Sequence, residues 1–187
     1  DEGFDLTYKE NQEKIEKYDS KIFTIFDIEN KNLNFIKNNL NYLKSFKKKE
    51  TKINQNLVFF LGTSFFESEN RSGEIKKYLE DVNKRFSNKE IQYFPHRSEK
   101  IDNELFKKFK IMSIDAPIEL HVLNCDQLPA IICGFYSTAL FTLKRIINND
   151  KIKIININFS LDSHNWDDSP DVEKHLSFTK ILNKNGV

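Results

Sequence analysis

The chain has 187 residues, 39% of them hydrophobic and 17 of them phenylalanine, with a formal net charge of +1. This length fits one domain of ordinary size or part of a larger enzyme, since domains usually hold about 100 to 200 residues. The near-neutral charge excludes a general attraction to nucleic acid, and no apolar run approaches the about 20 residues that a membrane helix needs. Cys125 and Cys133 lie in apolar context without C-x-x-C spacing, which indicates reduced, buried thiols of a cytoplasmic protein.

The first third of the chain is rich in Lys, Glu and Asn, with apolar residues at helical spacing. Those that define the spacing most clearly are Leu33, Ile36, Leu40, Leu43 and Phe46. The pattern predicts one or two amphipathic helices over residues 9–49. The run Lys47-Lys48-Lys49 at their end favours lysines that complement the helix dipole and face water, and contact with anionic lipid is the alternative.

From residue 57 the pattern changes to apolar runs that alternate with helical segments. The predicted strands are residues 56–62, 91–96, 111–116, 128–135 and 151–158. The predicted helices are residues 72–86, 100–110, 117–124, 137–147 and 169–186, the last with Ser169 as N-cap and Pro170 at its first position. This alternation predicts an α/β domain built around a mainly parallel, Rossmann-like sheet.

The residues that directly follow the apolar runs are the candidates for a binding site, because open α/β sheets bind ligands beyond the carboxyl ends of their strands. They are Gly62, Thr63 and Ser64, then His96, Arg97 and Ser98, then Asp115 and Glu119, then Ser137 and Thr138. Small hydroxyl residues that open a helix can receive a phosphate, and a histidine nearby would complete an anion site. The pattern therefore favours a phosphate-bearing ligand such as a nucleotide.

Each of these residues also has an ordinary structural explanation. Ser137-Thr138 can simply cap a helix, His96 can be a strand-end residue, and Glu119 can be a solvated charge in a first turn. Their occurrence at successive strand ends is what favours the binding site. The acidic cluster of residues 162–168 matches no standard metal-ligand spacing, so we interpret it as a loop and predict no metal.

Five short motifs in this order carry a family resemblance: DEGFDLTY, LGTSFFE, YFPHRSE, APIEL and GFYSTALFTL. Together they resemble the bacterial sialyltransferases of GT-B fold, most closely glycosyltransferase family 52, the lipooligosaccharide sialyltransferase group. The related families share an acidic-acidic-glycine motif, a histidine motif and a serine/threonine pair. Here these are Asp1-Glu2-Gly3, Pro95-His96-Arg97 and Ser137-Thr138. Several of the families follow the histidine with proline, whereas here Pro95 precedes it.

The resemblance implies a role for each motif residue. His96 contacts the phosphate of CMP and assists its departure, and Ser137 and Thr138 bind the same phosphate. Glu119 stands where related enzymes hold the ribose hydroxyls. The remaining donor-site residues are Gly62 and Thr63, which line the site, and Arg97, which either adds charge to it or pairs with Glu99.

The general base has three candidates. The acidic-glycine motif suggests Asp1, while Glu67 and Glu74 follow the first strand of the donor domain. No cofactor or metal is implied, because the chemistry needs only a stabilised leaving phosphate and a deprotonated acceptor hydroxyl.

The implied function is inverting, metal-independent transfer of sialic acid from CMP-sialic acid to a terminal galactose of a bacterial lipooligosaccharide or capsule. Residues 57–187 would form the CMP-binding domain, the C-terminal half of a GT-B enzyme. Residues 1–56 would form the end of the acceptor-side domain and a helical connector. We expect a piece of a longer enzyme, weakly active or inactive alone, cytoplasmic or peripheral on the inner membrane, with a connector that suits a homodimer. The alternatives are a non-catalytic nucleotide-binding or assembly module and a transferase for another nucleotide sugar.

Overall fold

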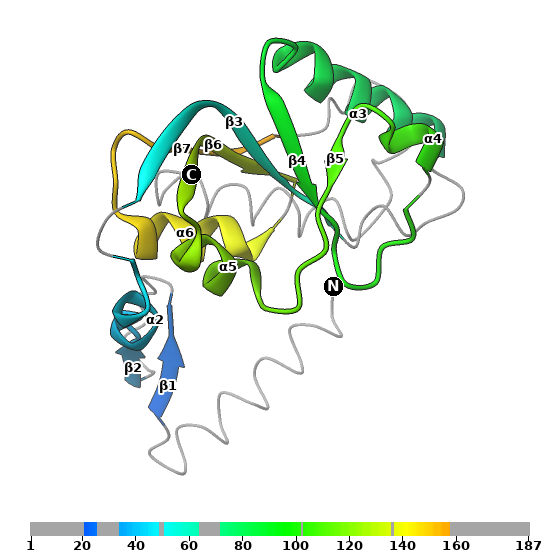
Figure 1. Cartoon of the computed structure of the whole chain (residues 1–187). Helices are drawn as coiled ribbons and strands as arrows, with labels where there is room; N and C mark the ends of the chain where they lie inside the picture. The colour runs from blue at the N-terminus through cyan, green and yellow to red at the C-terminus, as the bar shows by residue number, and fades with distance from the viewer. Residues whose placement is uncertain are drawn as a thin grey trace, which may run out of the picture. The chain divides into compact units, whose positions relative to one another are not determined.

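The structure is a computed structural model that describes residues 21–25, 34–48, 51–63, 72–101, 103–135 and 137–157 (Figure 1). The chain divides into two compact units, Asp1–Tyr42 and Leu43–Val187. The expected division at residue 56 assigns different functions to two parts of the chain, and this functional division stays a prediction.

The smaller unit contains a two-stranded parallel sheet. Strand β1 (Lys21–Thr24) pairs with β2 (Asn34–Lys37), and the Asn38 N–H donates to the Thr24 carbonyl at 2.8 Å. A short helix, α2 (Asn41–Ser45), spans the boundary between the units.

The predicted amphipathic helices are therefore wrong over residues 21–24, which form β1, and over residues 34–40. Ile36 lies in β2, and Leu40 has a positive φ of 56°. The Asn38 side chain accepts the Leu40 N–H at 2.9 Å, a local bond by which asparagine competes with helix formation. The helical spacing of the apolar residues did not reveal this competition, and the rest of residues 9–33 falls mainly outside the described ranges.

The larger unit carries a five-stranded sheet in the order β5-β4-β3-β6-β7, with every pair parallel. Its strands are β3 (Lys52–Leu61), β4 (Glu90–Phe94), β5 (Lys110–Ile111), β6 (Gln127–Gly134) and β7 (Lys153–Asn156). Within this sheet, the first strand in the sequence, β3, is central. The next two strands, β4 and β5, lie on one side of it, and β6 and β7 lie on the other side. This is the strand order of a Rossmann-like sheet, which confirms the predicted α/β fold with a parallel sheet.

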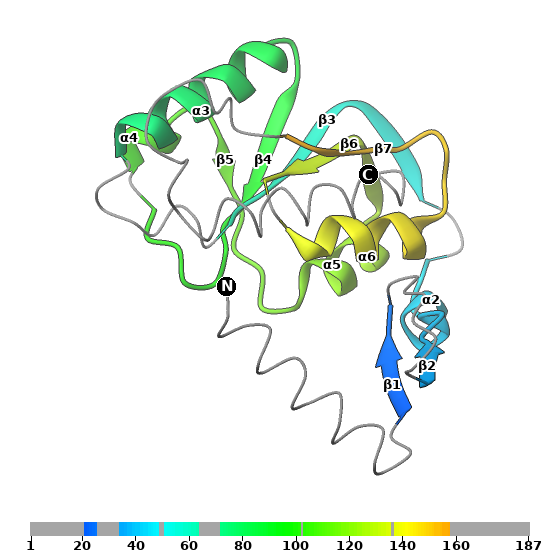
Figure 2. The ribbon, with the colours of Figure 1, turned by 180° about the vertical axis from the view of Figure 1, so that it is seen from behind.

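Two pairs of helices cover the two faces of this sheet. They are α3 (Ser72–Arg85) with α4 (Asn103–Phe106), and α5 (Ile118–Asn124) with α6 (Thr138–Ile147). The members of each pair contact each other, and both views show the two pairs apart (Figure 1, Figure 2). On the first face, Val58 and Phe60 of β3 share a buried cluster with Leu79 of α3. On the other, the ring of Phe59 lies 6.3 Å from that of His121 of α5.

Strand β3 is central because both of its faces are apolar. Residues 57–61 are all buried, with neighbouring side chains on opposite faces. The predicted strand 56–62 matches this buried part, and pairing with β6 extends β3 back to Lys52. Helix α4 and strand β5 are much shorter than predicted from residues 100–116, and the predicted helix 169–186 lies outside the described residues.

The basic run after α2 belongs to the larger unit and contacts the end of α6 and the residue before β6. The Lys47 ammonium donates to the carbonyl of Ile147 at 2.7 Å, in the last turn of α6, and Lys48 pairs with Asp126 at 2.6 Å. Lys47 therefore complements the negative end of α6 rather than of its own helix. Lys49 lies outside the described residues.

Candidate functional site

The sheet changes direction between β3 and β6. The two strands are neighbours in register, with Leu61 opposite Gly134 at their carboxyl ends. The chain leaves β3 toward α3 on one face and leaves β6 toward α6 on the other face. Ligands of open α/β sheets bind at such a point. Gly62 and Thr63 follow β3 here, and Ser137 follows β6, so three predicted site residues lie at the expected edge.

Helix α6 presents its N-terminus at this edge. Ser137 is the N-cap, in an extended conformation, and its side chain makes no capping hydrogen bond. The helix has ten residues and no acidic residue in its first turn. The backbone N–H groups of a helix's first turn lack intrahelical partners, and the helix dipole is positive there. The exposed Thr138 and the partly buried Ser137 thus stand beside donors suited to an anion.

His96 lies in a tight turn that follows β4. The Glu99 N–H donates to the His96 carbonyl at 2.8 Å, and the His96 N–H donates back to the Glu99 carboxylate at 3.0 Å. Nδ1 of His96 lies 2.6 Å from the hydroxyl oxygen of Ser98. These bonds are local to residues 96–99, so they hold both the backbone and the ring of the histidine.

Gly62 packs directly against this turn. Its N–H donates to the Phe94 carbonyl at 2.7 Å. A Cβ at position 62 would lie 2.7 Å from the His96 nitrogen and 2.7 Å from the Tyr93 hydroxyl, and it would also contact the Glu99 carboxylate. These separations are too short for a real Cβ, so only glycine fits. The structure thereby brings together two residues that the sequence analysis assigned separately to the donor site, Gly62 and His96.

The Glu99 carboxylate also accepts a hydrogen bond of 2.5 Å from the Tyr93 hydroxyl. Burial raises the pKa of Tyr93 far above its ordinary value, and the nearby charge of Glu99 and their hydrogen bond raise that pKa further. Tyr93 therefore stays protonated and donates. Sequence analysis missed this pair as a site feature. The signal was the His96-x-x-Glu99 spacing, at which a glutamate side chain can accept the backbone N–H three residues earlier, as the glutamate of a capping box does.

The other donor-site residues occupy less defined positions. Thr63 is buried, with 6% of its surface exposed. Glu119 is in the first turn of α5 and partly buried, and its carboxylate makes no hydrogen bond or ion pair with the other described residues. Arg97 is exposed at the tip of the histidine turn, and Glu99 is held by Tyr93 and His96 instead. The structure thus joins Gly62 to His96 but shows no contact of either with Glu119.

The three candidates for the general base stay predictions. Asp1 and Glu67 lie outside the described residues, as does the acidic cluster of residues 162–168. Glu74 lies in α3, but its side chain is not described. No group of three or more His, Cys, Asp or Glu suited to a metal occurs in the described part of the chain, and the expected absence of a metal also stays a prediction.

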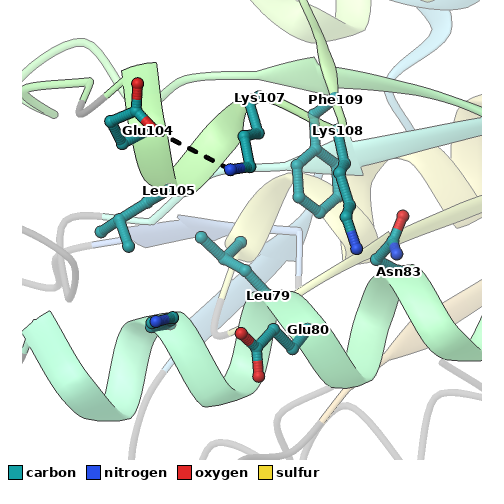
Figure 3. Close-up of a pocket in the computed structure, with 9 residues that line it drawn as sticks. Leu79, Glu80, Asn83, Glu104, Leu105, Lys107, Lys108 and Phe109 are labelled. Carbon is teal, nitrogen blue, oxygen red and sulfur yellow. Dashed lines mark ion pairs between the residues drawn. The ribbon is translucent and has the colours of Figure 1, made fainter.

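A separate hollow of about 430 Å³ lies between α3 and the segment from α4 to β5 (Figure 3). Leu79, Leu105 and Phe109 supply its apolar lining, and Glu104 pairs with Lys107 at 3.8 Å beside it. Its other lining residues are Lys76, Glu80, Asn83 and Lys108. Of the predicted site residues whose side chains the structure describes, none lines this hollow.

Comparisons with models of protein families and with curated proteins gave no match. The fold is that of a Rossmann-like α/β protein, and the residues at its switch point form a candidate anion site. Among the described helices, none is long and apolar enough to cross a membrane.

Proposed function

We propose that residues 57–187 are the donor-binding domain of a GT-B sialyltransferase and bind CMP-sialic acid between β3 and β6. One observation carries the proposal. The Gly62 end of β3, the His96 turn after β4 and the N-terminus of α6 follow three adjacent strands at the same edge of the sheet. This arrangement supports a phosphate site, and the motif resemblance supplies the sugar and the reaction.

In this proposal the phosphate of CMP is the leaving group and needs the most stabilisation. Sialic acid leaves through an oxocarbenium-like state, so negative charge grows on the phosphate. Nε2 of His96 meets that charge as a proton or hydrogen-bond donor, while Ser98 holds Nδ1. General acid help is worth about 10² to 10⁴ in rate. The Ser137 hydroxyl and the first N–H groups of α6 add fixed donors around the same anion.

The remaining roles follow the same site. Glu119 holds the ribose hydroxyls, Gly62 and Thr63 line the donor, and Arg97 adds positive charge at the rim. Asp1, Glu67 or Glu74 deprotonates the attacking hydroxyl of the acceptor galactose, and the anomeric configuration of the transferred sialic acid is inverted. Residues 1–56 form the end of the acceptor-side domain and the connector, and we propose a cytoplasmic enzyme, peripheral to the inner membrane and dimeric, that acts on lipooligosaccharide or capsule.

Calorimetric titration with CMP tests the proposal. We expect saturable binding that weakens about 10-fold or more in His96→Ala and in Ser137→Ala, because each removes a donor to the phosphate. Ser87→Ala is the matched control, since Ser87 is exposed in the turn between α3 and β4, at the opposite edge of the sheet. Equal affinity in all four proteins would contradict the site.

A second assay separates the enzyme from a binding module. The complete gene product is incubated with CMP-sialic acid and a lactose-type acceptor, and sialyl-lactose is measured. Transfer that His96→Ala abolishes supports the enzyme. CMP binding without any transfer would favour a non-catalytic module, and turnover of a different nucleotide sugar would correct the donor.

A further inference from the structure

Glu99 is a carboxylate that the proposed chemistry does not use, and both of its oxygens accept hydrogen bonds within and beside the histidine turn. Its two oxygens accept the Tyr93 hydroxyl and the His96 N–H, and its own N–H returns to the His96 carbonyl. A carboxylate with two donors on opposite oxygens is fixed in orientation as well as in position. Glu99 therefore ties the backbone of His96 to the sheet.

The anchor at the other end of this tie is rigid. Tyr93 is completely buried in β4, and its ring lies 4.6 Å from that of Phe106 and 5.1 Å from that of Phe60. A ring packed on several sides cannot turn its hydroxyl away from Glu99 without disturbing the core. The position of the carboxylate is thus set by the core of the sheet.

Gly62 closes the arrangement from the side of β3. A Cβ added at Gly62 would lie too near the His96 nitrogen, the Tyr93 hydroxyl and the Glu99 carboxylate for a side chain to fit there. The end of β3, the tyrosine and the turn therefore form one packed unit beneath His96. By contrast, Arg97 and Ser98, between the two bonded ends of the turn, are exposed.

We propose that Glu99 and Tyr93 are a positioning pair that aims His96 at the phosphate of the bound nucleotide. The pair acts through His96 and does not touch the substrate. This inference rests on the proposed function, because it assumes that His96 meets a phosphate. In the ligand-free protein, removing the pair should also change the environment of the His96 ring.

The test compares CMP with cytidine in variants of the 187-residue chain. Only CMP carries the phosphate, so a displaced His96 should weaken the binding of CMP and leave the binding of cytidine unchanged. In Glu99→Ala we expect about 10-fold weaker CMP binding, by analogy with the loss of a group that orients a metal-binding histidine, which costs about 10-fold or more. Glu99→Gln should recover most of it, since the amide oxygen can accept the His96 N–H while the amide nitrogen donates to the Tyr93 oxygen. Tyr93→Phe should resemble Glu99→Ala, and Glu80→Gln, exposed on α3, should resemble the unchanged protein.

Two outcomes overturn the inference. The first is wild-type CMP affinity in both Glu99→Ala and Tyr93→Phe. The second is an equal loss for CMP and cytidine, which would mean that the pair only supports the fold. If the unchanged chain binds no CMP, the proposed function fails, and the positioning of His96 is then tested in the ligand-free protein by nuclear magnetic resonance. The His96 imidazole cross-peak, identified by its loss in His96→Ala, should move in Glu99→Ala and return in Glu99→Gln. An unmoved peak would refute the positioning itself.

Discussion

Substituting Gly62 with alanine should destabilise the protein and displace the histidine turn. The added Cβ would lie 2.7 Å from both the His96 nitrogen and the Tyr93 hydroxyl. Neither neighbour can move freely, because one is a backbone atom and the other belongs to a fully buried tyrosine. Forcing a methyl group into such a packed site typically costs about 1 to 3 kcal/mol.

Gly73→Ala provides the matched control. Gly73 is exposed in α3, and a Cβ there meets nothing within 4 Å. Alanine favours a helix over glycine by about 0.5 to 1 kcal/mol, so this variant should be slightly more stable. The same chemical change is therefore expected to have opposite signs at the two positions.

Thermal unfolding followed by circular dichroism measures both. A change of 1 kcal/mol shifts the melting temperature of a domain of this size by about 2 to 4 °C. We expect a fall of about 2 to 12 °C for Gly62→Ala and a small rise for Gly73→Ala. Gly62→Ala should also weaken CMP binding, because the turn that carries His96 must move. An unchanged melting temperature in Gly62→Ala would refute the close packing of β3 against the turn.

Three further predictions concern the core. Burial lowers the pKa of His121 below its ordinary value of about 6.5, so as the pH falls the unfolded chain binds more protons at this residue than the folded protein does. The free energy of unfolding, measured by urea titration at each pH, should therefore fall as the pH drops from 7 toward 5, and it should fall less in His121→Phe. Burial raises the pKa of both thiols, but Cys133 is buried whereas Cys125 is partly exposed, so a thiol reagent should modify Cys125 in the folded protein and Cys133 only after unfolding, and fast labelling of both would contradict this. Tyr78 is buried and donates to the Ile157 carbonyl at 3.1 Å, so Tyr78→Phe should lose about 1 to 3 kcal/mol in urea unfolding, whereas Tyr42→Phe, 77% exposed, should lose less than about 0.5 kcal/mol.

The sheet was predictable because its buried strands consist of apolar residues, which are visible in the sequence. Residues 57–61 and 128–135 are continuous apolar runs, as strands covered on both faces require, and the amphipathic pattern of residues 72–86 matches α3. The same logic failed at Ile36, where apolar spacing suited a helix but an Asn38 side-chain bond and pairing with β1 gave a strand. Spacing alone carries no information about such competing bonds.

The site was predictable only at the level of strand ends. His96, Gly62 and Ser137 follow apolar runs, and the parallel sheet then requires them to share an edge. Tyr93 was not recognised, because a tyrosine within an apolar strand is typical of a core residue. Its ring does lie in the core, and only its hydroxyl takes part in the site, by donating to Glu99. The contact between Gly62 and the turn depends on the register of β3 against β4, which the sequence does not state.

Mapping CMP onto the folded chain by nuclear magnetic resonance tests the central claim most directly. The account predicts that backbone amide signals of Gly62, Thr63, His96 and Thr138 move together on titration with CMP, and move less with cytidine. Movement confined to other regions, such as the hollow lined by Leu79 and Lys108, or no movement at saturating CMP, would contradict a nucleotide site at the switch point of the sheet.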